Sequence, residues 1–218
     1  MIVFIIFLVL LKIVLWTKVL YRESNSQGIY DSKLIDLRTF VYVKSLELGI
    51  PVPRLVLKDT NEAIAIAVYS LKKSSVEIEK RLLDNYSPRE IRAVVLHELG
   101  HLKNKHSLKK IFFLEIPALL TSLSICLFIQ ELDLITILTI GLAFQYLWTY
   151  VFSKYLNHIH EFEADSITSR FNYHYDLISF LSKSLNECSE DFETITHPKY
   201  NKRIEKLEKI PYQIEFSL

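Results

Sequence analysis

The chain has 218 residues, a formal net charge of +1 at pH 7 and a hydrophobic content of 50%, with only 4 glycines and 2 cysteines. The near-neutral charge gives no reason to expect a nucleic-acid partner, and two cysteines cannot build the disulfide framework of a small secreted domain. This length allows either one large soluble domain or a smaller domain attached to a membrane, and the distribution of apolar residues decides between them.

Three apolar runs, each close to the roughly 20 residues that a helix needs to cross a bilayer, favour the membrane protein. They occupy residues 2–20, which include Lys12, residues 111–129, which include Glu115, and residues 134–152, which carry no charge. The remaining soluble sequence is too short to bury three such helices in one core. We therefore predict about three transmembrane helices, with Lys12 either facing protein or reaching toward the membrane surface.

Basic residues that flank these runs indicate their orientation. Lys18 and Arg22 follow the first run, four lysines lie at residues 103–110, and Lys154 follows the third run, whereas the link at residues 130–133 holds only acidic charge. The positive-inside rule then places the amino terminus and this link outside the cell. Because the first run has neither a basic leader nor a small-residue cleavage site, we expect it to be an uncleaved anchor.

The domain organisation follows from these segments. Residues 1–21 form the anchor, residues 30–110 and 154–218 form one cytosolic domain, and residues 111–153 form a transmembrane helical hairpin inserted in that domain. We expect a mainly α (α+β) multi-pass protein of the cell membrane, with the lipid bilayer as a partner and the functional site facing the cytoplasm.

A small sheet is predicted ahead of the hairpin. A helix at residues 31–48, which ends at Gly49-Ile50-Pro51, precedes three β-rich runs at residues 54–58, 63–69 and 75–79. These strands either cover the core or, where one forms an exposed edge, hold an extended peptide by main-chain pairing.

The helix that begins after Ser87 contains the sequence motif that is most informative about function. Residues 87–90 offer a capping-box serine at N-cap, a proline at the first helical position and a glutamate at N3. Further along, residues 97–101 read His-Glu-Leu-Gly-His, so two histidines lie one above the other on one helical face and can share a zinc ion. Glu98, turned about 100° away, can act as general base toward a water molecule. The alternative is a solvated helix with two surface histidines.

A catalytic zinc site needs a third protein ligand, and candidates follow the third apolar run. If that run continues as a helix, His158, Glu161 and Asp165 share one face, whereas Glu163 points away as a solvated neighbour. Glu161 is then the central candidate, and Asp165 can orient a metal-bound histidine through its free ring nitrogen. The alternative is that these are ordinary polar residues at a helix exit.

Lengths along the two helices support this pairing. His101 lies ten residues before residue 111, and Glu161 lies nine residues after Phe152. These separations correspond to roughly 15 Å and 13 Å of helix. A hairpin of two spans therefore brings both residues to a similar height above the membrane.

Three separate motifs resemble those of the membrane zinc metalloproteases that include bacterial HtpX and the eukaryotic CAAX prenyl proteases. They are residues 97–101 with Asn104, residues 161–165 as Glu-aromatic-x-Ala-Asp, and residues 196–198 as Thr-His-Pro followed by Arg203-Ile204. Residues 61–63 are a looser match to the family's Asn-Ala-Phe, and the resemblance covers residues 35–210. It implies a zincin-like catalytic domain with one zinc ion per chain, bound by His97, His101 and Glu161, with Glu98 as the base and with His197 and Arg203 near the active site.

We therefore interpret the chain as a membrane zinc metalloendopeptidase that cuts peptide or protein substrates, membrane proteins among them, at the cytosolic face. The resemblance to HtpX implies a cellular function in membrane protein quality control. Two alternatives remain open. One is a regulatory membrane protease that cleaves a single signalling protein, and the other is a non-catalytic scaffold with a structural zinc, whose closed site would have no need of Glu98.

Overall fold

The computed structural model describes residues 10, 12–18, 32–59, 65–71, 73–128, 133–187 and 191–211. Several sequence features lie wholly or partly outside these residues, namely most of the first apolar run, Arg22, residues 61–63, the link at residues 130–132 and Cys188. Within the described part the chain is mainly helical with one small mixed sheet, as the sequence predicts.

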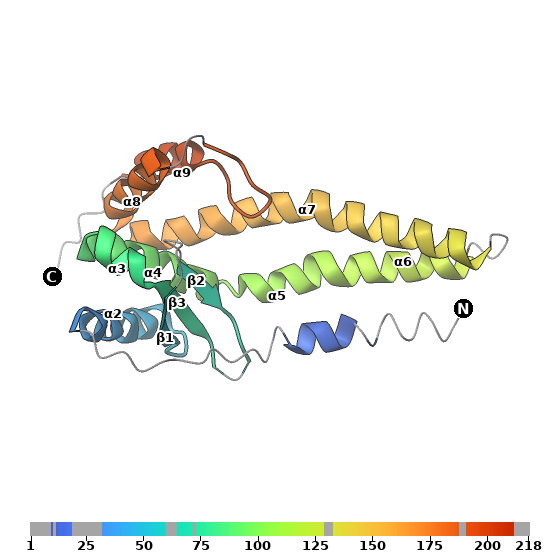
Figure 1. Cartoon of the computed structure of the whole chain (residues 1–218), viewed down its shortest axis with the longest axis horizontal. Coiled ribbons are helices and arrows are strands. Elements are labelled where there is room, and N and C mark those ends of the chain that lie inside the picture. Colours follow the sequence, from blue (N-terminus) through green and yellow to red (C-terminus); the bar gives the residue numbers. More distant parts are fainter. Residues whose placement is uncertain are drawn as a thin grey trace.

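A head and a stalk make up the described chain (Figure 1). The stalk consists of α6 (Ile116–Phe128) and the first part of α7 (Leu134–Arg170), which run antiparallel and side by side. The head contains the sheet and five helices: α2 (Ser32–Leu48), α3 (Lys80–Asn85), α4 (Pro88–Lys103), α8 (His174–Glu187) and α9 (Tyr200–Glu208). Because α7 has 37 residues, it reaches from the tip of the stalk into the head. This confirms the prediction that the third apolar run continues as a helix.

The sheet has three strands, β1 (Arg54–Lys58), β2 (Ala65–Val68) and β3 (Ser75–Glu79), in the order β1-β3-β2. β1 runs parallel to β3, and β2 runs antiparallel to it. The predicted ranges of β1 and β3 are confirmed, whereas β2 is shorter than the predicted 63–69, with residues 63 and 64 outside the described part. In this three-stranded order β2 is an edge strand, and it packs beside α4.

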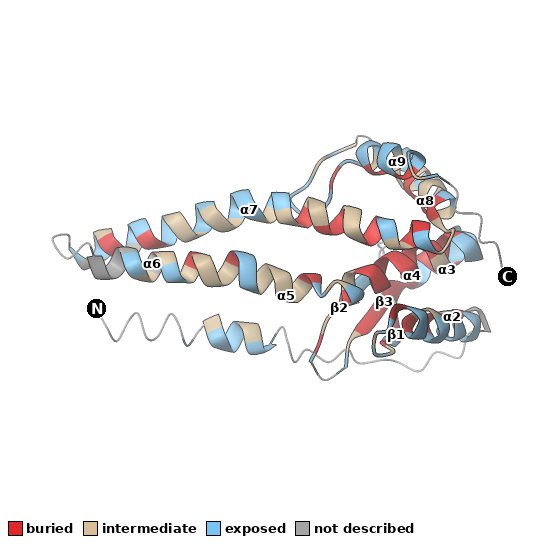
Figure 2. Ribbon diagram, turned by 180° about the vertical axis from the view of Figure 1, so that it is seen from behind, coloured by how far each residue is buried: buried red, intermediate tan, exposed pale blue. Residues whose placement is uncertain are grey.

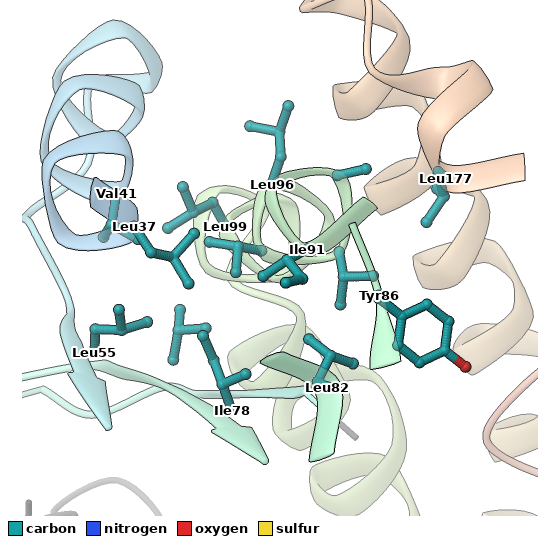
Figure 3. Close-up of a cluster of buried hydrophobic side chains, with 14 of the residues drawn as sticks. Leu37, Val41, Leu55, Ile78, Leu82, Tyr86, Ile91, Leu96, Leu99 and Leu177 are labelled. Atoms are coloured by element: carbon teal, nitrogen blue, oxygen red, sulfur yellow. The ribbon is translucent and has the colours of Figure 1, made fainter. Parts of the chain in front are cut away.

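The core of the head surrounds α4, which is buried along most of its length (Figure 2). Its leucine and isoleucine side chains meet apolar residues of α2, the sheet and α8 (Figure 3). The labelled members of this cluster are Leu37, Val41, Leu55, Ile78, Leu82, Tyr86, Ile91, Leu96, Leu99 and Leu177. Apolar contacts on several sides fix the rotation of α4 about its own axis, so its polar residues are buried at defined positions.

The chain between α4 and the stalk departs from a single straight helix. α4 ends at Lys103, Lys105 adopts a left-handed conformation with φ of 51°, and a short helix α5 (His106–Lys110) follows. The second apolar run then begins with a π-helical turn, η1 (Ile111–Glu115), before α6. Such turns widen the backbone locally and often lie at functional positions.

Among the described residues, one helix, Ile135–Arg170, is long and apolar enough to cross a membrane. Only 12% of its most apolar stretch is buried, so it is not the core helix of the head. Figure 2 shows the same contrast, because the stalk is mostly exposed or half-buried although its side chains are apolar. Lys12 lies against this region and pairs with Glu115 of η1 at 2.5 Å, so it faces protein, which is one of the two predicted positions.

Candidate metal centre

Helix α4 supplies three of the candidate site residues, and its start is firmly held. Both halves of the predicted capping box are present, with Glu90 N–H donating to Ser87 Oγ and Ser87 N–H donating to Glu90 Oε2. The buried Glu90 carboxylate also accepts hydrogen bonds from Ser179 and Lys183 of α8. These contacts fix α4 relative to α8, which forms one side of the cleft described below.

A close approach of α4 to α7 brings the third candidate to the two histidines. A Cβ atom on Gly100 would lie 3.0 Å from the Cα atom of Ala164 and 3.2 Å from its carbonyl oxygen. Glycine at position 100 and alanine at position 164 therefore let the two backbones nearly touch. Glu161 lies one turn before Ala164 on α7, so this contact sets its distance from His97 and His101.

The three candidate ligand atoms converge on one point. His97 Nε2 lies 3.1 Å from His101 Nε2 and 3.6 Å from Glu161 Oε2, and His101 Nε2 lies 3.3 Å from Glu161 Oε1. A tetrahedral zinc ion with bonds of about 2.0–2.1 Å requires ligand atoms roughly 3.3–3.4 Å apart. The observed spacings lie on either side of this value, with each histidine facing a different carboxylate oxygen of Glu161. The donor set of two imidazoles and one carboxylate suits zinc. The residues present therefore fit the metal that the sequence predicts.

Asp165 and Arg203 lie on the side of His97 that faces away from the other two candidate ligands. Asp165 Oδ1 lies 2.9 Å from His97 Nδ1, the ring nitrogen that faces away from the other two ligands. Arg203 donates to both oxygens of Asp165, from Nε at 2.9 Å and from Nη2 at 2.7 Å. All three side chains are buried. Burial alone would raise the pKa of Asp165, but the charge of Arg203 and the hydrogen bond to His97 lower it, so this carboxyl group stays ionised.

Glu161 is surrounded by hydrogen-bond donors. Besides the two α4 histidines, His197 Nδ1 and Arg203 Nη1 each lie 3.1 Å from Oε2. Burial opposes ionisation, yet in the metal-free protein, where the histidine rings can carry protons on these nitrogens, hydrogen bonds from His101, His197 and His97 hold the pKa of Glu161 well below its ordinary value. These contacts favour the ionised form of Glu161, which is the form that binds a metal.

Glu98 lies beside these residues in a different electrostatic setting. Its Oε2 atom accepts a hydrogen bond of 2.6 Å from the main-chain N–H of Ala67 on the edge strand β2. Burial raises the pKa of Glu98, although the charges of His101 and His97 oppose the increase. A raised pKa makes this carboxyl group a better proton acceptor than an ordinary glutamate.

Glu163 lies away from the candidate ligands, as the helical register predicts, and its side chain is 40% exposed, but it is also bound by neighbouring side chains. Its Oε2 atom accepts hydrogen bonds from His106 Nε2 at 2.9 Å and from Lys109 Nζ at 3.0 Å. These two contacts were not predicted, because they depend on α5 folding back against α7 on this side, and the sequence gives no sign of that. His158, which shares a helical face with Glu161, instead contacts the carbonyl oxygen of Thr194 at 3.0 Å and does not reach the candidate ligands.

A cleft of about 530 Å³ opens at the candidate ligands. The edge strand β2 borders it through residues 65–67, and four apolar residues of α4 and α8 line another part of it. These four are Val94, Leu177, Phe180 and Leu181. Glu98, His197 and Arg203 also line the cleft, so every predicted site residue except the buried Asp165 faces it.

Two contributors to the site were not found from the sequence. Ala67 acts through its main-chain N–H, which no side-chain motif can reveal. His106 contacts His101 with an Nδ1 to Nδ1 distance of 2.7 Å, although the helix is broken between them. The one available signal was the presence of a further histidine five positions after His101, and such a spacing does not share a face on an unbroken helix.

A buried histidine, a partly exposed histidine and a buried carboxylate meet beside a second glutamate. This is the arrangement of a His-Glu-x-x-His metallopeptidase site with glutamate as the third ligand. The comparison with known families agrees with this class. The chain belongs to peptidase family M48, whose family model matches residues 42–211.

Individual relatives match shorter stretches. Protease HtpX homolog 2 of Methanosarcina acetivorans is 33% identical over 95 residues, which are 43% of this chain and 30% of that protein. Protease HtpX of Stutzerimonas stutzeri is 38% identical over 61 residues, which are 28% of this chain and 21% of that protein. The chain therefore matches less than a third of the length of these two relatives.

Among solved structures, the crystal structure of S. mikatae Ste24p has a similar fold, with a TM-score of 0.68 and 15% sequence identity. The similarity covers 93% of this chain and 56% of the Ste24p chain. At this identity the likeness concerns the fold alone, and it includes the stalk as well as the head.

Replacing Gly100 tests whether the α4 and α7 contact positions Glu161. Alanine favours a helix over glycine by about 1 kcal/mol, so Gly100→Ala should not weaken α4 itself. Its Cβ atom would meet the Ala164 backbone at 3.0 Å and push α7 away by a few tenths of an ångström. We expect roughly tenfold weaker zinc binding, measured by competition with a chelator. A folded variant with the parental affinity would show that this contact does not set the site.

Proposed function

We propose that the chain is a zinc metalloendopeptidase embedded in the cell membrane, which hydrolyses peptide bonds of proteins at the cytosolic face. The observation that carries this proposal is the convergence of the ligand atoms of His97, His101 and Glu161 beside Glu98. The most direct experiment measures zinc content and cleavage of an unfolded protein such as casein by the purified protein in detergent. We expect about one zinc ion per chain and zinc-dependent cleavage.

The chain's own residues divide the chemistry between them. Bound at His97, His101 and Glu161, a zinc ion supplies a Lewis acid that polarises the scissile carbonyl group and acidifies a water molecule. Glu98 takes the proton from the attacking water and later delivers a proton to the leaving amine, and its raised pKa suits both steps. Asp165 and Arg203 hold His97 in the orientation that leaves its Nε2 lone pair free for the metal.

The edge strand β2 supplies the substrate-binding surface. Ala67 N–H is already donated to Glu98, so the same edge of β2 faces the cleft. Ala65, two residues away, presents its main-chain groups on this edge, and an extended peptide can pair there as an added strand. Only an unfolded or extended segment can enter in this way. The apolar part of the cleft then receives an apolar side chain of that segment.

The membrane arrangement has three spans, formed by the first apolar run, by η1 with α6, and by the first part of α7. The stalk supports it, because large apolar side chains of α7 such as Tyr146, Leu147 and Tyr150 are 72%, 60% and 52% exposed. Exposed side chains of this kind form a surface for lipid. The head then lies on the cytosolic side, as part of a domain that we assign to residues 30–110 and 154–218, with the hairpin of residues 111–153 inserted in that domain.

Cysteine labelling tests this topology. In a background without Cys126 and Cys188, an impermeant thiol reagent applied to intact cells should label a cysteine at Asp133 but not one at Asn201. Both positions are exposed in the structure, so access differs only through the membrane. Labelling at Asn201 in intact cells would invert the topology and move proteolysis to the outer face.

His197 acts on the transition state. Its side chain is 57% exposed, it lines the cleft, and its Nδ1 atom lies 3.1 Å from Glu161. An imidazole at this position can donate to the oxyanion that develops during hydrolysis. His197→Ala should then lower kcat by about 10²- to 10³-fold while KM and zinc content change little. Lys202→Ala, at an exposed position of α9, is the matched control. A His197→Ala enzyme with the parental kcat would remove His197 from the site.

The cellular function that we propose is the turnover of damaged membrane proteins. A site on the cytosolic membrane face that accepts only extended chain suits such substrates. Quantitative proteomics of cells that carry the active protein or its Glu98→Gln variant tests this cellular function. Accumulation of many misassembled membrane proteins supports quality control, whereas accumulation of a single protein would favour a regulatory protease.

A further inference from the structure

A hydrogen-bonded chain of side chains lies behind His101. His101 Nδ1 is 2.7 Å from His106 Nδ1, and His106 Nε2 is 2.9 Å from Glu163 Oε2. These hydrogen bonds therefore link α4 to α7 through the first residue of α5. The break after α4 produces it, because the left-handed conformation of Lys105 turns His106 back toward the end of α4.

Proton positions along this chain follow from what each atom can do. If His101 binds the metal through Nε2, its only proton is on Nδ1, which must donate to His106 Nδ1. His106 Nδ1 is then an acceptor, so the proton of this ring is on Nε2. That nitrogen needs an acceptor in turn, and the Glu163 carboxylate, which can only accept when ionised, lies at 2.9 Å from it. All of these hydrogen bonds can therefore form at once, with His101 donating to His106 and His106 donating to Glu163. This arrangement leaves a lone pair on His101 Nε2, which is directed at the other two candidate ligands.

We propose that His106 and Glu163 are positioning residues for the metal ligand His101, through this chain of hydrogen bonds. The inference rests on the proposed function, since it assigns a role toward the zinc ion. Under this proposal a carboxylate orients each of the two candidate histidine ligands. Asp165 contacts His97 directly, whereas Glu163 acts on His101 through the His106 ring.

The packing around His106 holds its ring in one orientation. It is 3% exposed, and the ring of His160 stacks on it with centroids 4.0 Å apart and an angle of 6° between the planes. The stack restrains the tilt of His106, and the hydrogen bonds at both ring nitrogens restrain its rotation. Supports of this kind around metal-bound histidines fix the tautomer and typically change metal affinity by about 10- to 100-fold.

Zinc affinity, measured on the full-length protein in detergent by competition with a chelator, tests the role of His106. His106→Leu should weaken zinc binding by about 10- to 100-fold. His106→Asn should restore most of the affinity, because the amide oxygen can take the place of Nδ1 and accept from His101. Equal zinc affinities for the parental protein and a folded His106→Leu variant would overturn the proposal.

Glu163 gives a second test that does not disturb the core, because its side chain is 40% exposed. Glu163→Ala should weaken zinc binding by about tenfold, and Glu163→Gln, which keeps an acceptor oxygen for His106, should lose less. Lys109→Gln is the matched control, since it removes the other partner of Glu163 and leaves the hydrogen bond to His106 intact. If Lys109→Gln weakens zinc binding as much as Glu163→Ala does, the carboxylate acts through Lys109 and the proposal is wrong.

Cobalt substitution supplies a readout that a purely structural role would not move. The visible absorption bands of bound Co²⁺ should shift in His106→Leu and Glu163→Ala but not in Lys109→Gln, because only the first two change the donor strength of His101. A parental protein that binds no zinc would overturn both this inference and the proposed function. A parental protein that binds zinc and cleaves casein, with variants of equal affinity and unshifted spectra, would overturn this inference alone.

Discussion

Glu98→Gln should retain the metal and lose proteolysis. The amide has nearly the same shape as the carboxylate, and it can still accept the hydrogen bond from Ala67 N–H. It cannot take a proton from water, and general acid–base catalysis by a positioned side chain typically contributes about 10²- to 10⁴-fold. We therefore expect a fall of that size in the rate of casein cleavage at unchanged zinc content.

The control for this experiment is a carboxylate-to-amide change elsewhere on the head. Glu205 is exposed on α9 and pairs only with Lys209 among the described residues, so Glu205→Gln should cleave at the parental rate. Undiminished cleavage by Glu98→Gln would remove Glu98 from the catalytic role and would leave the raised pKa without a function.

Loss of Glu161 should remove the metal. Glu161→Gln keeps the volume of the side chain and an oxygen for Arg203 and His197, but it lacks the negative charge that binds zinc. Two histidines remain, and a catalytic zinc site needs three protein ligands. We expect zinc, measured by elemental analysis after dialysis, to fall from about one ion per chain to a small fraction of that, with proteolysis lost in parallel.

Glu163→Ala is the comparison that gives this result its meaning. The two carboxylates are two positions apart on α7, but Glu163 contacts His106 and Lys109 and none of the three candidate ligand atoms. When both variants are measured at the same excess of zinc, Glu163→Ala should keep close to one ion per chain in spite of its weaker binding, whereas Glu161→Gln should not. Retention of zinc by Glu161→Gln together with its loss from Glu163→Ala would mean that the ligand has been assigned to the wrong carboxylate.

Local signals in the sequence located most elements of the head. The capping box at Ser87 marks the start of α4, and the alternating runs mark β1 and β3. The grouping of His97, His101 and Glu161 could be inferred because helical geometry fixes which residues share a face and how far a helix reaches. Their role as metal ligands remains a prediction until a metal is measured.

Other features depend on contacts that leave no local pattern. The break at Lys105 and the π-helical turn η1 interrupt what the sequence presents as continuous helix, and both alter the neighbours of the site. The partners of Glu163 were therefore missed, because α5 and not the helical register of α7 supplies them. The role of Arg203 was left open by the sequence, and the structure shows it bound to both Asp165 and Glu161.

The measurement that tests the central claim most directly is proteolysis by metal-free protein to which zinc is returned. The parental protein in detergent is treated with a chelator, dialysed, and assayed on casein, with new amino termini identified by mass spectrometry. The account predicts no cleavage without metal and recovery of cleavage on addition of about one equivalent of zinc. Cleavage that persists in the metal-free protein, or a protein that holds one zinc ion at His97, His101 and Glu161 and cuts no peptide bond, would contradict it.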